Sequence, residues 1–139
     1  RLYFALTGSQ SAATPGQGII YTLPLKDQPV SDDLEVFFTY PEPGSGPDGI
    51  AFGLSGRLYV ALAGSNQISI LNPDGTEAAR FPSAIDNQSQ PVPYDAPASI
   101  AFDGRGSLLV TNHSFFANNA ANWVVFDAWV NDTALSPAP

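Results

Sequence analysis

Short stretches in which apolar and polar residues alternate run along much of the chain. In residues 67–72 (QISILN), for example, the apolar Ile68 and Ile70 alternate with polar neighbours, as expected of a strand that buries one face. No stretch sustains the i, i+3, i+4 apolar spacing of an amphipathic helix. The pattern therefore predicts an all-β protein with almost no helix.

A sequence motif recurs at an interval of 50 residues. Residues 47–52 (PDGIAF) align with residues 97–102 (PASIAF), and residues 56–60 (GRLYV) align with residues 106–110 (GSLLV). The opening RLYFAL matches the RLYVAL that begins at Arg57, at a longer interval because a polar stretch follows Leu6. Repeats of about 50 residues are typical of β-propeller blades.

The middle copy of the motif indicates four antiparallel strands, which is the content of one propeller blade. Asp and Gly tolerate the backbone angles of tight hairpins, so Pro73-Asp74-Gly75 is predicted to join the third strand to the fourth. The first strand is short and rich in small residues, which suits the innermost position around an axis. We place the four strands at 48–53, 57–63, 67–72 and 77–82.

The fold class predicted is therefore a partial β-propeller of about two and a half four-stranded blades. Such a fragment leaves an open sheet edge at each end, and we expect the rest of a ring to cover both. The predicted parts are the outer strands of one blade at 1–40, a complete blade at 47–83, the last blade at 97–130 and a tail along the rim at 131–139.

Composition narrows the classes of function. Among 139 residues, 44% are hydrophobic and 13% charged, which excludes a disordered tail. The net charge of −8 disfavours nucleic acid and anionic membrane surfaces as partners, and suits neutral or cationic ligands or a metal ion. Cysteine is absent, so neither disulfides nor thiolate metal sites are possible.

Three N-x-[ST] sequons, at Asn87, Asn112 and Asn131, favour a secreted, extracellular glycoprotein. No apolar run approaches the roughly 20 residues that a membrane helix requires. The chain opens on a strand-like segment without an initiator Met, and we expect the true N-terminus to lie upstream or to have been removed.

The succession of GPDGIAF, GRLYVA and ILNPDG between residues 46 and 75 resembles the fifth blade of the six-bladed gluconolactonase and regucalcin family. Residues 97–113 resemble the sixth blade, and the opening segment resembles the outer strands of the fourth. The resemblance covers nearly the whole chain but only the C-terminal half of that family. It implies a six-bladed ring and calcium-dependent hydrolysis of a sugar lactone or related ester.

In that family a divalent cation, usually calcium, lies at one mouth of the central tunnel. Its ligands are a Glu and Asn residues from the earlier blades and the Asp of the Pro-Asp-Gly that opens the fifth blade. Only the last carries over, onto Asp48, since the others would precede Arg1. The resemblance thus implies that the fragment alone is inactive and that its partner is the N-terminal half of the propeller, in the same chain or in a second one.

Asp48 is the candidate metal ligand and the candidate catalytic base. Asp74 serves as a comparison within the same chain, because it lies in an identical Pro-Asp-Gly tripeptide and is predicted to be a turn residue only. Asp48 precedes the innermost strand, whereas Asp74 joins two strands at the rim. In the third repeat the matching residue is Ala98, followed by Ser99, so one blade alone supplies a charged ligand.

Chain direction places the loops 7–17, 64–66 and 112–122 on the same face as Asp48. The last loop holds the candidate substrate-binding residues Asn112, His113 and Phe115. His113 would act either as a proton shuttle and substrate contact or simply as a loop residue that caps the blade.

The aromatic residues in and near this loop allow two interpretations of their role. Phe115 and Phe116 would form either a hydrophobic lip over the mouth or a packing contact between blades. Trp123 and Trp129 fall in the last apolar run of the chain and are predicted to pack between blades.

Two other functions stay open at this point. One is a non-catalytic propeller that binds a protein or a carbohydrate, and the other is a propeller similar to strictosidine synthase, which uses a catalytic carboxylate without a metal. A propeller fold hosts many activities and does not choose among them.

Overall fold

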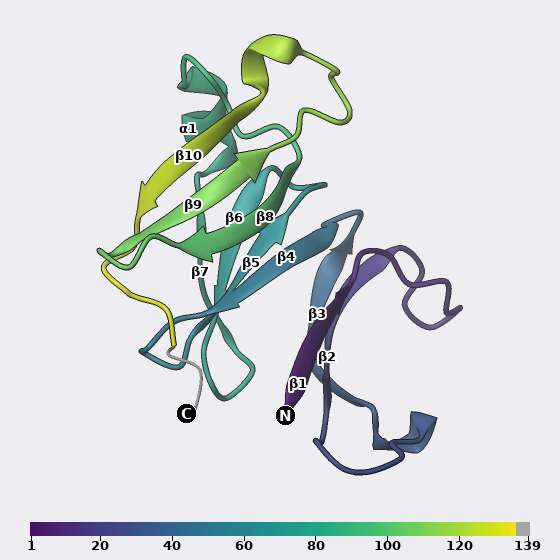
Figure 1. Ribbon diagram of the computed structural model, residues 1–139. Coiled ribbons are helices and arrows are strands. Elements are labelled where there is room, and N and C mark those ends of the chain that lie inside the picture. Colours follow the sequence, from purple (N-terminus) through teal and green to yellow (C-terminus); the bar gives the residue numbers. More distant parts are fainter. Residues whose placement is uncertain (136–139) are drawn as a thin grey trace.

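The computed structural model describes residues 1–135 and consists of three antiparallel sheets that follow one another along the chain (Figure 1). The sheets have the strand orders β1-β2-β3, β4-β5-β6-β7 and β10-β9-β8. This confirms the predicted all-β fold built of propeller-type blades, and no closed ring forms within the described residues. The strands are β1 (Leu2–Leu6), β2 (Gln17–Leu23), β3 (Glu35–Pro43), β4 (Pro47–Phe52), β5 (Leu58–Leu62), β6 (Gln67–Leu71), β7 (Glu77–Phe81), β8 (Pro97–Phe102), β9 (Ser107–Asn112) and β10 (Val124–Trp129).

The 50-residue repeat of the sequence is also a repeat of strand pairing. The second and third sheets share the same register between their first two strands, with the same register shift near the start of the inner strand. The corresponding pairs are Ile50 with Val60 and Ile100 with Val110, Ala51 with Tyr59 and Ala101 with Leu109, and Phe52 with Leu58 and Phe102 with Leu108.

Only the middle sheet has four strands. The first sheet begins at the counterpart of β5, so it has no counterpart of the inner strand β4 within the described residues. The third sheet ends at β10, the counterpart of β6, and has no counterpart of the outer strand β7 among residues 1–135.

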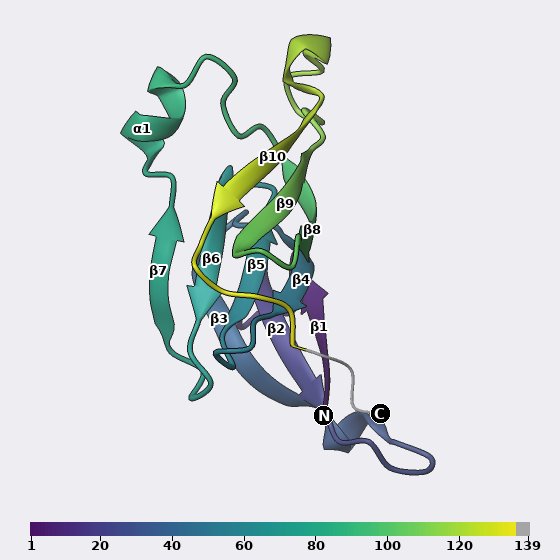
Figure 2. The ribbon, with the colours of Figure 1, turned by 60° about the vertical axis from the view of Figure 1, so that its left-hand side comes forward.

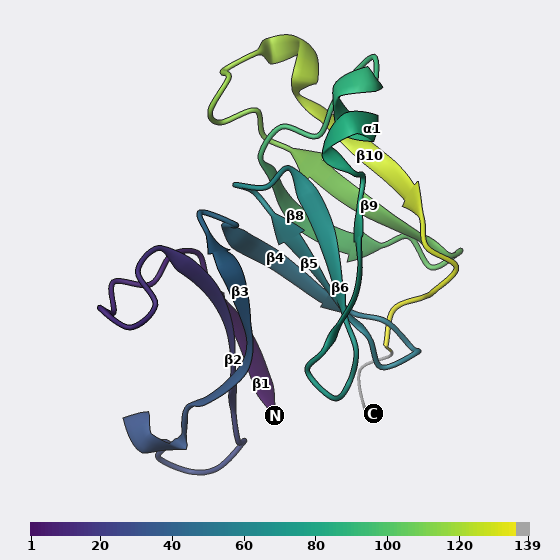
Figure 3. The same ribbon diagram turned by 180° about the vertical axis from the view of Figure 1, so that it is seen from behind.

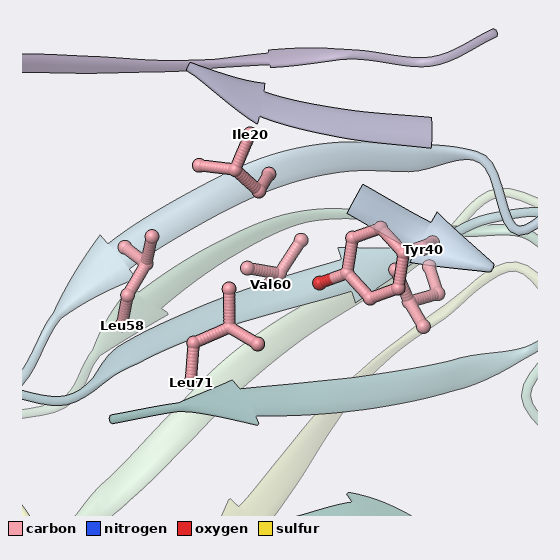
Figure 4. Close-up of a cluster of buried hydrophobic side chains, with 6 residues drawn as sticks. Ile20, Tyr40, Leu58, Val60 and Leu71 are labelled. Carbon is pink, nitrogen blue, oxygen red and sulfur yellow. The ribbon is translucent and has the colours of Figure 1, made fainter. Parts of the chain in front are cut away.

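Two apolar clusters hold the three sheets together. The first lies between the first and second sheets, where Ile20 and Tyr40 pack on Leu58, Val60 and Leu71 (Figure 4). The second lies between the second and third sheets, and its fully buried members are Tyr59, Ala61, Ile68, Leu108 and Val110. The central strand β5 is therefore buried on both faces, which explains why it is a continuous apolar run and not an alternating one.

Helical structure is confined to connections, close to the prediction of almost none. The six-residue helix α1 (Ala84–Ser89) follows β7 (Figure 2). The Ser83 side chain caps its first turn by accepting a hydrogen bond from the Asp86 amide. Two 3-10 turns lie at Ser31–Asp33 and Ala120–Asn122. Within residues 1–135, no helix is long and apolar enough to span a membrane.

The prediction that Trp123 and Trp129 pack between blades is wrong for the described residues. Their side chains are 61% and 69% exposed. The reason is their place in the fold, because Trp129 lies on the face of β10 opposite to Phe126 and Ala128, which pack toward the second sheet, and Trp123 lies in the loop just before β10. Phe115 and Phe116 are similarly exposed and do not pack between sheets.

Residues 131–135 return from the third sheet to the turn between β4 and β5. The Leu54 amide donates to the Thr133 carbonyl at 2.7 Å, and the Leu135 amide donates to the Phe52 carbonyl at 3.1 Å. The Asp132 carboxylate occupies the space that a Cβ on Gly53 would need, so this position accepts only glycine without a rearrangement. The tail thus fastens the third sheet to the second, while residues 136–139 lie outside the described residues.

Candidate functional site

The start of β4 and the loops that follow β1 and β9 lie on one side of the molecule (Figures 1 and 3). The Thr7 hydroxyl, just after β1, donates to the Pro47 carbonyl at 3.1 Å. The Ala63 amide, just after β5, donates to the Gly46 carbonyl at 2.8 Å. Two of the three loops that chain direction places beside Asp48, 7–17 and 64–66, are therefore tied to the segment that carries it.

Asp48 lies at the start of β4, the innermost strand of the complete blade, and it is exposed. Among residues 1–135 its carboxylate takes part in no hydrogen bond and no ion pair. Asp74 differs in this respect, because its carboxylate accepts hydrogen bonds from the amide and the hydroxyl of Thr76 at 3.0 and 2.6 Å. Those bonds lower the pKa of Asp74. They are the bonds expected of a residue whose role is to stabilise a turn.

The starts of the inner strands β4 and β8 lie against each other. A Cβ on Gly49 would stand 2.8 Å from the Ser99 Cα, so glycine at this position permits the close approach. Ala98, which matches Asp48 in the repeat, therefore lies next to the Asp48 segment and brings no carboxylate. Asp48 is the acidic group that the described chain offers on these two inner strands.

Asn112 is buried, and its side chain is fully engaged with backbone groups. Its amide nitrogen donates to the Asn122 and Pro93 carbonyls at 2.8 and 3.0 Å, and its oxygen accepts from the Asp95 amide at 2.8 Å. Asn112 therefore closes the loop after β9 and fixes its position. Any contact with a substrate would come from the residues that this loop displays.

His113 and the two phenylalanines form an exposed aromatic group on this loop. The His113 ring lies 5.6 Å from the Phe115 ring, and the Phe115 ring lies 5.4 Å from the edge-on ring of Phe116. A shallow depression of about 420 Å³ lies beside them, lined by Ala98, Thr111, Asn112, His113 and Trp123. His113 and Asn112 thus share one depression, while Phe115 lies on the outer part of the loop.

A buried polar network that sequence reasoning missed anchors this loop. The carboxylate of Asp95, only 8% exposed, accepts from the Ser114 hydroxyl at 2.5 Å and from the Asn122 amide at 3.1 Å. The Ser114 hydroxyl oxygen also accepts a hydrogen bond from the Asn119 amide at 2.9 Å. Asp95 lies two residues before Pro97, just as Ser45 lies two residues before Pro47. This shared position in the 50-residue repeat is the feature of the sequence that could have indicated a structural role for Asp95.

Among residues 1–135, no three His, Cys, Asp or Glu side chains gather closely enough to hold a metal ion. The described chain would therefore contribute Asp48 to a cation site and would need further oxygen ligands from elsewhere.

No family model matches this chain. A search of curated proteins likewise finds no match. The resemblance to the gluconolactonase and regucalcin family therefore stays a prediction from the motifs.

Proposed function

We propose that the protein acts as a calcium-dependent hydrolase of the lactonase type, with its site at the mouth of a propeller ring. Asp48 would be a ligand of the cation, and the remaining ligands would come from blades beyond these three sheets, in the same polypeptide or in a second one. The substrate would be a sugar lactone or a related ester. The observation that carries the proposal is the exposed Asp48 carboxylate at the start of an innermost strand, which has no hydrogen bond or ion pair within the described part of the chain.

The chemistry of Asp48 fits a calcium ion, because hard cations prefer carboxylate and carbonyl oxygens. A bound calcium would polarise the substrate carbonyl and lower the pKa of a nearby water. The Asp48 carboxylate would also accept a proton from the attacking water. His113 lies exposed on the neighbouring loop and would contact the substrate.

Asn112, Phe115 and Phe116 would shape the substrate side of the mouth. Asn112 acts indirectly, since its hydrogen bonds hold the loop in place. Phe115 and Phe116 are 67% and 69% exposed and would supply the apolar contact. Residues 106–126 contain no Asp, Glu, Lys or Arg, which suits a neutral substrate.

The same exposed rings favour a second candidate, a non-catalytic propeller that binds a carbohydrate or a protein. Aromatic faces and amide groups on a fixed loop are typical of such recognition. A metal-independent carboxylate mechanism, as in strictosidine synthase, is a variant of the hydrolase proposal in which Asp48 acts alone.

Calcium-dependent hydrolysis by a polypeptide that carries the complete ring tests the proposal. Wild-type protein is expected to hydrolyse a sugar lactone only with calcium present, and Asp48→Asn is expected to lower the rate by about 100-fold or more. Asp74→Asn is the matched control and should leave the rate unchanged. Equal activity of the Asp48→Asn variant would refute a role for Asp48, and activity without any divalent cation would favour the metal-independent variant.

The secreted location stays a proposal that now rests on one sequon. Asn87 and Asn112 are buried, and both side chains are hydrogen-bonded to the backbone. Asn131 is exposed. If the protein follows the secretory route, peptide mass mapping after expression in a eukaryotic secretory host should find a glycan on Asn131 alone.

A further inference from the structure

Both chain neighbours of Asp48 are held by the adjoining sheets. On its N-terminal side, Pro47 is fully buried, and its ring lies so close to β2 that a Cβ on Gly18 would overlap it. On its C-terminal side, Gly49 lies against the backbone of Ala98 in the third sheet. The Asp48 carboxylate is thus carried by a short piece of backbone that the first and third sheets fix from opposite sides.

The hydrogen-bonded ladder between β4 and β5 is irregular at Asp48. The register shifts between Pro47 and Ile50, so that Asp48 and Gly49 both stand opposite Ala61. A bulge of this kind redirects a side chain and disrupts the ladder locally. The backbone direction at Asp48 therefore depends on contacts from outside the ladder.

Thr7, in the loop after β1, supplies one of these contacts. Its hydroxyl donates to the Pro47 carbonyl at 3.1 Å, and this carbonyl belongs to the peptide group that joins Pro47 to Asp48. The Thr7 hydroxyl makes this one side-chain hydrogen bond among residues 1–135. Because a β-branched side chain has few χ1 rotamers, little conformational freedom is lost when the bond forms.

The loop that carries Thr7 is closed by bonds of its own. The Ser9 amide donates to the Gln17 carbonyl at 2.8 Å, and the Gly16 amide donates to the Ser9 carbonyl at 2.8 Å. The Thr14 hydroxyl donates to the Ser9 hydroxyl at 2.9 Å. Loss of the Thr7 hydroxyl should therefore leave the loop in place and remove only its bond to the start of β4.

The third sheet offers a comparison within the same molecule. The match between RLYFAL and RLYVAL makes Ala63 the counterpart of Thr7, and the inner strand that follows it begins with Pro97 and Ala98. Ala63 has no hydroxyl, and no side chain of the described residues donates to the Pro97 carbonyl. The threonine bond is therefore present at the inner strand that carries a carboxylate and absent, within residues 1–135, at the inner strand that carries alanine.

We propose that Thr7 is a positioning residue for Asp48, whose bond to the Pro47 carbonyl holds the carboxylate ready for a divalent cation. The inference rests on the hydrolase proposal in one respect, namely that Asp48 binds a cation. Thr7 acts through the backbone and need not touch the cation or the substrate. A ligand whose backbone is already fixed loses less freedom on binding, so the affinity for the cation should rise.

A titration of the 139-residue chain with Mn²⁺, followed through the amide signals in nuclear magnetic resonance spectra, tests the inference. Thr7→Val and Thr7→Ala remove the hydroxyl, and each should raise the Mn²⁺ concentration that halves the Gly49 signal by about three- to tenfold. Thr7→Ser keeps the hydroxyl and should stay within about twofold of wild type. Thr14→Val is the matched control, because it removes a hydroxyl of the same loop that has no bond to β4, and it should match wild type.

The possible outcomes separate this inference from the hydrolase proposal. If wild-type chain shows no Mn²⁺ binding that Asp48→Asn abolishes, both fail. If wild type binds and the hydroxyl-free Thr7 variants match it, the role of Thr7 alone is overturned. Equal weakening in Thr7→Ser or Thr14→Val would overturn it as well, because the integrity of the loop and not the hydroxyl would then matter.

The hydrogen bond itself has a separate readout that a general loosening of the loop would not give. The carbonyl carbon shift of Pro47 should move upfield in Thr7→Val and stay unchanged in Thr7→Ser and Thr14→Val. An unchanged shift in Thr7→Val would contradict the inference. Circular dichroism of each variant must show the wild-type fold.

Discussion

The Asp132 carboxylate holds the C-terminal segment on the second sheet, and its removal should destabilise the protein measurably. It accepts hydrogen bonds from the Ser55 amide at 3.2 Å, the Tyr59 hydroxyl at 3.1 Å and the Thr133 amide at 2.9 Å, and it also accepts from the Ser55 hydroxyl. Tyr59 is only 1% exposed, so Asp132→Ala would leave a buried hydroxyl without a partner, at a cost of about 1–3 kcal/mol. The Ser55 bonds are exposed and add about 1 kcal/mol at most.

We therefore expect Asp132→Ala to lower the free energy of unfolding by about 1–4 kcal/mol near neutral pH. Urea titration followed by tryptophan fluorescence measures it. Asp127→Ala is the matched control, since Asp127 is exposed on β10 and has no hydrogen bond among residues 1–135; it should change the free energy by about 0.5 kcal/mol or less.

The pH dependence of this difference has a definite sign. Burial alone would raise the pKa of Asp132, but hydrogen bonds from Ser55, Thr133 and Tyr59 outweigh it and the pKa is lowered. A carboxyl with a lowered pKa stabilises the fold above its unfolded-state pKa of about 3.9, and that stabilisation is lost as the pH falls through the folded-state pKa. The gap between wild type and Asp132→Ala should therefore shrink below about pH 4. A loss under about 0.5 kcal/mol at pH 7, or a gap that persists in acid, would refute the reasoning.

Three further predictions follow from single contacts. Among residues 1–135 the buried Tyr40 hydroxyl has no hydrogen-bond partner, so Tyr40→Phe should leave the free energy of unfolding unchanged or raise it by up to about 1 kcal/mol. Tyr59→Phe should instead lower it by about 1–2 kcal/mol in the same urea titration. Gly49→Ala should lower the free energy of unfolding by about 1–3 kcal/mol, because the added methyl meets the backbone of β8; thermal unfolding that matches wild type would contradict this packing. Asp95→Asn weakens the anchor on the Ser114 hydroxyl, so chymotrypsin should cut the loop after β9 about tenfold faster, and an unchanged cleavage rate would show that the anchor is dispensable.

The blade architecture could be predicted because it depends on local sequence patterns that recur along the chain. The predicted strands 48–53, 57–63, 67–72 and 77–82 differ from β4, β5, β6 and β7 by one residue at one or both ends. Turns such as Pro73-Asp74-Gly75 have their own local chemistry, and the 50-residue offset fixed which residues correspond.

The candidate site could be predicted only in part, because much of it depends on contacts between distant residues. The position of Asp48 follows from its phase in the repeat. The bond from Ser114 to Asp95 spans 19 residues, and the bond from Tyr59 to Asp132 spans 73, so no local pattern reveals either. The prediction that Trp129 packs between blades was wrong for a related reason, because an apolar residue in a strand indicates a buried face only where another sheet covers it.

The most direct test of the central claim, that Asp48 holds a cation at the mouth, is a residue-resolved nuclear magnetic resonance titration of the 139-residue chain with manganese. Mn²⁺ prefers oxygen ligands and broadens the signals of nearby amides, so even weak binding is seen. We predict that the Gly49 and Ile50 amides broaden first, that excess calcium restores them, and that Asp48→Asn abolishes the effect while Asp74→Asn preserves it. Equal broadening around Asp48 and Asp74, or broadening that survives in Asp48→Asn, would contradict the account.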